Sequence, residues 1–148
     1  MKEKFIQAYM DVAHRFAQLS HARRLHVGAI VVKDDRIISI GYNGMPAGWD
    51  NDCEEVIEQH EDGGQILKTR PEVLHAEMNA LMKLAKSTES GEGATMFITH
   101  SPCIECAKGM YQAGIKEIYY GEEYRSSQGI DFLKKCKIKI EKISNDIK

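Results

Sequence analysis

The sequence predicts a single α/β domain built around a mixed β-sheet. Short runs rich in Val and Ile indicate strands, and helical patterns alternate with such runs in the second half of the chain. Strands and helices that alternate at this spacing imply βαβ crossovers, which make neighbouring strands parallel. A chain of 148 residues with 43% hydrophobic content can bury one ordinary core. We therefore expect residues 1–148 to form one domain, with a loop insertion at about residues 45–71.

The first half of the chain predicts a helix and a hairpin. Residues 3–20 repeat apolar positions at helical spacing and end at the polar stretch SHARR, as in an amphipathic helix. Residues 27–42 contain two runs rich in Val and Ile joined by the turn-prone KDD, which predicts two antiparallel strands. The segment 45–71 carries Pro, Gly, Trp and acidic residues, so it predicts a long loop with only a short helix near residues 54–60.

The second half predicts helices and strands in alternation. A helix over about residues 76–86 precedes the strand ATMFITH, and a helix that begins near Ile104 precedes the strand KEIYYG. A helix near residues 128–135 and the strand KIKIEKI follow. Because helices separate these strands, we expect them to pair in parallel.

Composition and charge exclude several classes of function. Lys and Arg number 20 against 22 Asp and Glu, and the sequence pI is near 6.3, so the basic face of a nucleic-acid-binding protein is missing. No apolar run approaches the ~20 residues of a membrane span, and the first residues, MKEKFIQAYMDVA, are charged and amphipathic, unlike a signal peptide. We therefore expect a cytoplasmic protein that binds neither nucleic acid nor membrane.

Cysteine and histidine positions indicate a metal site. The motif SPCIECAKGM places Cys103 and Cys106 three residues apart, so that one helical turn can direct both sulfurs to one point. Such a pair alone could equally be a redox dithiol or half of a structural zinc site. His75, in VLHAEMNALM, adds a third ligand. One His and two Cys leave the fourth tetrahedral position of Zn²⁺ open for water, which is typical of a catalytic site.

Glu77 lies two residues after His75 and suits a proton-transfer role. Zinc lowers the pKa of a bound water toward ~7, and a neighbouring carboxylate can accept the released proton. Considered alone, Glu77 would be a first-turn carboxylate that interacts with the helix dipole. In combination, H-x-E and P-C-x-x-C are the signature of zinc nucleobase deaminases.

The motifs HAEMNA, SPCIECAKGMYQAGIKEI, VGAIVV and GYNGMPAG together resemble the deoxycytidylate (dCMP) deaminases of the cytidine deaminase superfamily. The resemblance runs from Ser20 to about Tyr124. It implies a cytidine-deaminase-like three-layer α/β fold, with a five-stranded mixed sheet flanked by helices. It also implies zinc-dependent hydrolysis of dCMP to dUMP and ammonia, in which a water activated by the metal attacks C4 of cytosine.

The resemblance also assigns residues to these roles. His75, Cys103 and Cys106 would bind Zn²⁺, and Glu77 would act as general acid and base. Asn43 would hydrogen-bond the nucleoside, and Val27 and Ala76 would line the pocket for the base. By approximate alignment, the residues that would contact the 5′-phosphate are Ser101, Lys86 and Tyr124.

Regulation and assembly are further implications of the resemblance. Relatives with the GYNGMP loop are activated by dCTP and inhibited by dTTP, and Mg²⁺ would accompany the triphosphate. The residues implied for this allosteric site are Arg24, Gly41, Asn43 and Gly44. The glycines would leave amide groups free for phosphate oxygens, although a bare GYNG is also an ordinary turn that ends a hairpin. The resemblance further implies a homo-oligomer, a hexamer, which in a phage protein would work in the host cytoplasm.

Some phage and bacterial relatives carry a second, structural zinc near the insertion. The candidates in this chain are His21, Cys53 and His60, although their wide spacing is also that of unrelated surface residues.

Three alternative functions share some of these features. A tRNA adenosine deaminase, or another deaminase of single-stranded nucleic acid, would use the same zinc residues but needs a cationic groove with stacking aromatics. This chain has net charge −2 and 7% aromatic residues. A riboflavin-pathway deaminase is not expected to contain GYNGMP, and a structural zinc domain would not need an open coordination position beside Glu77.

Overall fold

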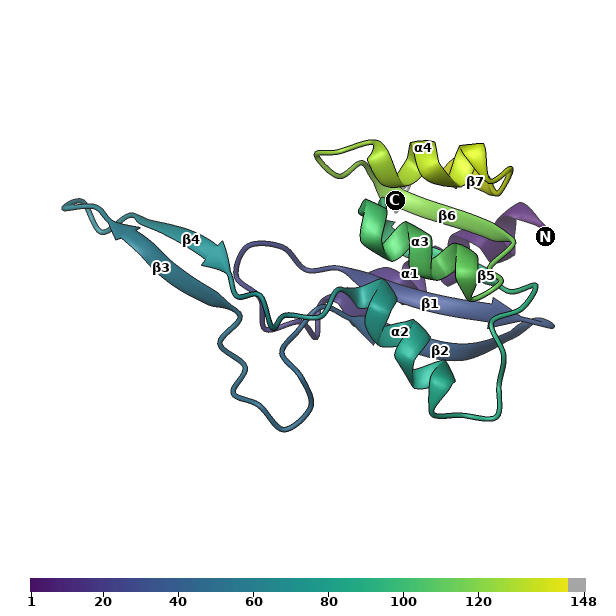
Figure 1. Cartoon of the computed structure of the whole chain (residues 1–148), viewed down its shortest axis with the longest axis horizontal. Helices are drawn as coiled ribbons and strands as arrows, with labels where there is room; N and C mark the ends of the chain where they lie inside the picture. The colour runs from purple at the N-terminus through teal and green to yellow at the C-terminus, as the bar shows by residue number, and fades with distance from the viewer. Residues whose placement is uncertain (144–148) are drawn as a thin grey trace.

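The computed structural model describes residues 1–143, which form an α/β sheet domain with one projecting hairpin (Figure 1). The elements in chain order are α1 (Glu3–Ala17), β1 (Gly28–Lys33), β2 (Arg36–Tyr42), β3 (Glu54–Gln59), β4 (Gln65–Thr69), α2 (Ala76–Ala85), β5 (Thr95–His100), α3 (Ile104–Gln112), β6 (Glu117–Glu122), α4 (Gln128–Lys135) and β7 (Lys139–Lys142). None of these helices is long and apolar enough to cross a membrane.

The main sheet has five strands in the order β2-β1-β5-β6-β7. Strand β1 is antiparallel to both β2 and β5, whereas β5, β6 and β7 are parallel to one another. The hairpin expected at residues 27–42 and the parallel pairing expected in the second half are therefore confirmed. The five-stranded mixed sheet flanked by helices, implied by the resemblance, is confirmed as well.

Helices cover both faces of the sheet and make three layers. Alternate residues of β1 point to opposite faces, so Ala29 and Val31 join a core with α2 and α3, whereas Ile30 and Val32 pack with α1. Residues buried on both faces explain why this strand is a continuous apolar run. The sheet is thus a rigid central layer on which the helices are fixed.

The segment expected to be a loop contains a second, two-stranded sheet. Residues 54–59 form strand β3, which pairs antiparallel with β4, so the short helix expected there is wrong. The β-branched residues Val56, Ile57 and Ile66 favour extended structure, and Gly63, at φ 91°, permits the turn between the strands. Figure 1 shows this hairpin projecting away from the main sheet.

Helix α2 is held against β2 by polar contacts and by a very close backbone approach. The Ser39 hydroxyl donates to the carbonyl of Ala80 at 2.7 Å, and the side-chain amide of Asn79 donates to the carbonyl of Tyr42 at 2.8 Å. A Cβ atom at Gly41 would lie 2.3 Å from the carbonyl oxygen of Ala76. Only glycine permits this approach, which fixes where the first turn of α2 lies.

Candidate active site

The N-termini of α2 and α3 bring together the four residues expected to carry the chemistry. His75 is the N-cap of α2 and Cys103 is the N-cap of α3, whereas Glu77 and Cys106 lie in the first turns of the same helices. The chain enters α3 directly from the carboxyl end of β5, through Ser101 and Pro102. In open α/β sheets this edge is where ligands generally bind.

The geometry of the three predicted ligands fits a tetrahedral zinc ion. The Nδ1 atom of His75 lies 3.5 Å from the sulfur of Cys103 and 3.4 Å from that of Cys106. Zinc bonds of about 2.3 Å to sulfur and 2.05 Å to nitrogen, at a tetrahedral angle, would separate these atoms by about 3.6 Å. Within residues 1–143, this is the one group of three or more ligand side chains close enough to hold a metal ion.

The protonation of the two thiols also favours a bound cation. Hydrogen bonds from Cys106 and His75 stabilise the Cys103 thiolate and lower the pKa of Cys103 to about 3. The same hydrogen bond to Cys103, followed by burial and the charge of Glu77, raises the pKa of Cys106. A divalent metal between the two sulfurs would stabilise both of them as thiolates.

Glu77 is a buried carboxyl group on the wall of the same cavity as the predicted ligands. Burial raises its pKa from 4.5 to about 7, against the smaller opposing effects of its own backbone amide and of His75. A group that is half protonated near neutral pH can both accept and donate a proton there. Glu77 is thus suited to general acid and base catalysis beside the predicted ligands.

A cavity of about 390 Å³ opens beside His75 and Glu77. This volume lies within the usual range for small-molecule sites. Five of the predicted substrate-contacting residues line it: Val27, Asn43, Ala76, Ser101 and Tyr124. The structure therefore brings together residues from the start of β1, the end of β2, both helix N-termini and the loop after β6.

Asn43 uses its side chain to shape the cavity wall. Its Oδ1 accepts a hydrogen bond from the amide of Val27 at 2.9 Å, and its Nδ2 donates to the carbonyl of Leu25 at 2.7 Å. Its own amide also donates to the carbonyl of Val27. Asn43 therefore fixes the segment before β1 against the loop after β2, and it retains one N–H and one lone pair for a ligand.

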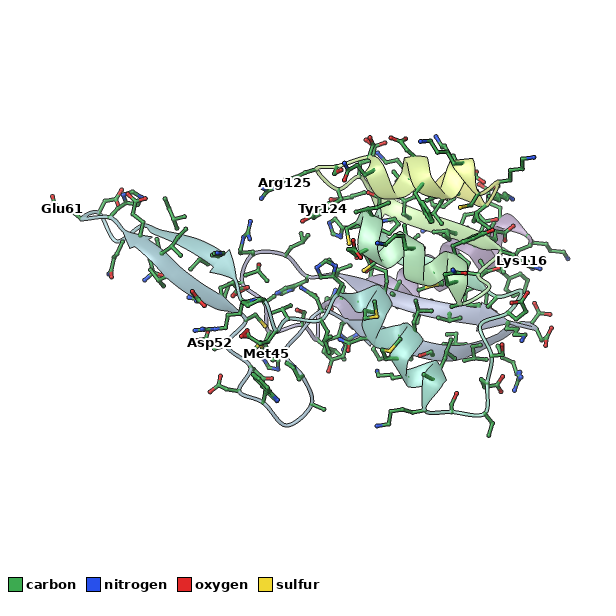
Figure 2. All side chains as sticks on the ribbon, viewed as in Figure 1. Met45, Asp52, Glu61, Lys116, Tyr124 and Arg125 are labelled. Atoms are coloured by element: carbon green, nitrogen blue, oxygen red, sulfur yellow. The ribbon has the colours of Figure 1, made fainter. Side chains whose placement is uncertain are left out.

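The loop after β6 supplies a cation that the sequence analysis missed. The hydroxyl of Ser101 accepts a hydrogen bond from the amide of Tyr124 at 2.7 Å, which holds this loop beside the cavity. Arg125, the next residue, also lines the cavity, and Figure 2 shows Tyr124 and Arg125 together on this loop. A cation that follows the end of a parallel strand was the available signal for Arg125.

Lys86 lies away from the cavity beside His75 and Glu77. It caps the C-terminus of α2, whereas the cavity lies at the N-terminus of that helix, and it does not line the cavity. Ten helical residues separate the two ends by roughly 15 Å. The expectation that Lys86 contacts the substrate phosphate is therefore wrong for this geometry.

The glycines expected to bind an effector have other roles. Gly41 is buried beneath α2, where it permits close packing. Gly44 exchanges two backbone hydrogen bonds with Leu74, so its amide is not free for a phosphate oxygen. The engaged amide of Gly44 does not support its expected contact with a phosphate, and the effector role of Gly41 stays a prediction.

Arg24 lines the cavity beside His75 and Glu77 and not the second cavity, and its role in an allosteric site stays a prediction. Its guanidinium donates to the hydroxyl of Thr69 at 3.2 Å. The loop after β2 does form a second cavity of about 320 Å³, and Asn43 and Gly44 line it together with Trp49. Because Asn43 lines both cavities, it connects them physically.

The three candidates for a second zinc do not form one group of ligands within residues 1–143, although His21 and Cys53 both line the second cavity. Cys53 is buried at the base of the hairpin, where its thiol contacts the carbonyl of Asn51. His60 follows β3, at the far end of the hairpin and beside Glu61, which Figure 2 labels at the tip. A six-residue strand spans roughly 20 Å, so Cys53 and His60 cannot share one metal ion.

Comparisons with known proteins agree with this site. Residues 3–122 match the family described as "Cytidine and deoxycytidylate deaminase zinc-binding region". The crystal structure of dCMP deaminase from the cyanophage S-TIM5, in complex with dCMP and dUMP, superposes with a TM-score of 0.86 and is 47% identical. That match covers 97% of this chain and 99% of the cyanophage chain.

Two curated relatives extend the comparison. Deoxycytidylate deaminase of Enterobacteria phage T4 is 34% identical, covering 78% of this chain and 76% of its own length. ComE operon protein 2 of Bacillus subtilis is 40% identical over 81% of this chain, which spans only 60% of the Bacillus protein. The resemblance to deoxycytidylate deaminases inferred from the motifs is thus confirmed, and the chain belongs to the cytidine and deoxycytidylate deaminase family.

Proposed function

We propose that this protein catalyses the hydrolytic deamination of dCMP to dUMP and ammonia at a zinc ion. The observation that carries the proposal is the placement of three zinc-compatible ligand atoms beside a buried carboxyl group, on a cavity of nucleotide scale. The 47% identity to an enzyme crystallised with dCMP and dUMP supports this choice of substrate.

Each residue of the site has a distinct task in this reaction. When bound by His75, Cys103 and Cys106, zinc would polarise a water molecule and lower its pKa toward ~7. Glu77 accepts the proton of that water as oxygen adds to C4 of cytosine, and it delivers the proton to N3. Glu77 next accepts the remaining proton of the oxygen now bonded to C4 and transfers it to the 4-amino group, which leaves as ammonia as the C4–N bond breaks and the C4 carbonyl forms. One water is consumed, and the carboxyl group ends in its starting state.

The phosphate of dCMP requires cations and donors near the mouth of the cavity. Arg24 and Arg125 line this cavity and can each pair with phosphate oxygens in a bidentate manner. The hydroxyl groups of Ser101 and Tyr124 line the same cavity and add donors. We place the 5′-phosphate among these four residues, which replaces Lys86 in the expected set.

A substrate panel tests the proposed reaction. Ammonia release would be measured with dCMP, CMP, dCTP, deoxycytidine and adenosine in RNA, and dCMP should be deaminated with the highest kcat/KM. Faster reaction with adenosine in RNA would favour the tRNA deaminase alternative, and no reaction with any substrate by zinc-loaded protein would contradict the proposed activity. Removal of zinc with a chelator should abolish turnover, and added Zn²⁺ should restore it.

We also propose that the second cavity, beside the loop after β2, binds the regulatory nucleotides, dCTP with Mg²⁺ as activator and dTTP as inhibitor. Asn43 supports this site because it lines both cavities, so a ligand in one can alter the other. Regulation requires two conformations for which the effectors have different affinities. Sigmoidal dCMP kinetics should become hyperbolic with Mg²⁺-dCTP, and dTTP should raise the half-saturating dCMP concentration.

Trp49 allows the regulatory site to be tested separately from catalysis. It lines the second cavity and not the first, so Trp49→Ala should weaken both effector responses and leave effector-free turnover near the wild-type value. Kinetics indifferent to both nucleotides at millimolar concentration in the wild-type protein would show that the loop is only a turn.

We further propose that the chain assembles into a homo-oligomer, a hexamer. Met82 of α2 and Tyr111 of α3 remain exposed after these helices cover the sheet, so apolar helix surface is left over for another copy. Sedimentation should give six times the 16.7 kDa subunit mass, and a mass of 16.7 kDa at micromolar concentration would contradict the proposal.

A further inference from the structure

The β3–β4 hairpin is supported by the rest of the chain only at its base. Arg70 donates to the carbonyl of Cys53 through its amide and to Asp52 through its guanidinium, and Arg23 reaches Glu54. Beyond the base, no helix or strand within residues 1–143 packs along the hairpin, and Figure 1 shows it extending into solvent. An isolated two-stranded hairpin is at best marginally stable in water, so this one needs a covering surface.

The hairpin exposes apolar side chains that such a surface would bury. Val56, Ile57 and Ile66 are 44%, 57% and 41% exposed. Val56 lies opposite Leu67 in the ladder, whereas Ile66 lies opposite Glu58. Because Ile66 and Leu67 are consecutive, their side chains point to opposite faces of the ribbon. Exposed apolar groups therefore lie on both faces of the hairpin, as expected of a hairpin that a partner contacts on both faces.

Charge identifies the partner. Residues 54–69 hold five acidic side chains and one basic side chain, Lys68, so their net charge is −4. The whole chain has a net charge of −2, so the residues outside 54–69 together carry +2. An acidic arm repels phosphate-bearing ligands and is attracted to the basic body of another copy. That body also offers exposed apolar groups, including Met82 and Tyr111. We infer that the β3–β4 hairpin is an arm that binds the body of a second copy of this chain.

The base of the arm belongs to the wall of the catalytic cavity. Glu54 and Thr69, the first and last residues of the hairpin, both line that cavity. The buried carboxylate of Glu54 accepts hydrogen bonds from the amides of Arg23 and Arg24, and the guanidinium of Arg24 donates to Thr69. A second copy that binds the arm therefore helps to hold Arg24 in place at the cavity. Loss of that second copy should raise the KM for dCMP more than it lowers kcat.

Two variants test the arm. Ile57→Lys combined with Ile66→Lys removes two exposed apolar groups and reverses part of the arm's charge. In the second variant, Asn-Gly replaces residues 55–68. The ends of this deletion, Glu54 and Thr69, already pair across the hairpin, so a two-residue turn can join them without disturbing the cavity wall. Ile37→Lys, on β2, is the matched control because Ile37 is 38% exposed and lies outside the arm.

Sedimentation of the zinc-loaded proteins measures the outcome. We expect the wild type and Ile37→Lys to form the same oligomer, and both arm variants to form smaller species with wild-type zinc content and circular dichroism. Arm variants that keep the wild-type mass would overturn the role of the arm and leave self-association intact, whereas a monomeric wild type would overturn both. The inference rests on the proposed self-association and not on the proposed substrate, because mass is measured without turnover.

Discussion

Substituting Gly41 by Ala should disable the site although Gly41 itself does not line the cavity. The new Cβ would lie 2.3 Å from the carbonyl oxygen of Ala76 and 2.6 Å from the amide nitrogen of Ala80, whereas ordinary contacts begin near 3.4 Å. The first turn of α2 must then move by about 1 Å, and His75 and Glu77 move with it. Overpacking of this kind typically costs about 1–3 kcal/mol of folding stability, and a misplacement of about 1 Å can cost roughly 100-fold in rate.

Gly44→Ala is the matched control for this prediction. No atom lies within 4 Å of a Cβ at Gly44, so this variant should keep wild-type turnover and stability. Thermal unfolding, zinc content and dCMP turnover would be measured on both variants and the wild type. If Gly41→Ala retained full turnover and melting temperature, the close packing of α2 on β2 would not be what positions the site.

Further predictions concern the ligands, the cavity wall and pH. His75→Ala and Cys103→Ser should each lose zinc by elemental analysis; retention of a full zinc complement by either would refute its assignment as a ligand. Arg125→Ala should raise the KM for dCMP at least ~10-fold and change deoxycytidine turnover little, because only dCMP has a phosphate. The control Lys116→Ala should change neither, because Lys116 lies at the distant end of the body in Figure 2. Asn43→Ala should raise the KM for dCMP and lower stability by about 1–2 kcal/mol, because the Val27 amide and the Leu25 carbonyl lose their partner; unchanged unfolding by urea would contradict this. In the metal-free protein, the raised pKa of Glu77 means that the folded state binds more protons than the unfolded state between pH 4.5 and about 7. The free energy of unfolding of the metal-free wild type should therefore fall by up to about 3 kcal/mol as pH rises through this window. Glu77→Gln should not show this fall, and urea unfolding at pH 5 and pH 8 would measure the difference.

The sequence predicts the sheet and the metal ligands because local patterns determine them. Continuous apolar runs specify β1 and β5, and the helices that separate β5, β6 and β7 favour their parallel pairing. The spacing within H-x-E and P-C-x-x-C places each pair on one helical turn, so the ligand set can be predicted before the turns are known to meet.

Contacts that depend on distant segments could not be predicted in this way. The role of Gly41 depends on the approach of α2 from 35 residues further along the chain, and the engagement of the Gly44 amide depends on Leu74. The hairpin at residues 54–69 was missed because its polar and acidic composition resembles a loop, although its Val and Ile residues favour strands. Arg125 could be predicted only from its position after the end of a parallel strand, because no motif in the sequence includes it.

Zinc content and dCMP turnover, measured together on the wild type and on Glu77→Gln, test the proposed activity most directly. Glutamine keeps the shape of the side chain but cannot exchange a proton, and the ligands His75, Cys103 and Cys106 are unchanged. We predict about one zinc per chain in both proteins and a turnover lower by about 10²–10⁴-fold in the variant. Turnover near the wild-type value in zinc-loaded Glu77→Gln, or a wild-type protein that binds zinc and does not deaminate dCMP, would contradict the proposed function.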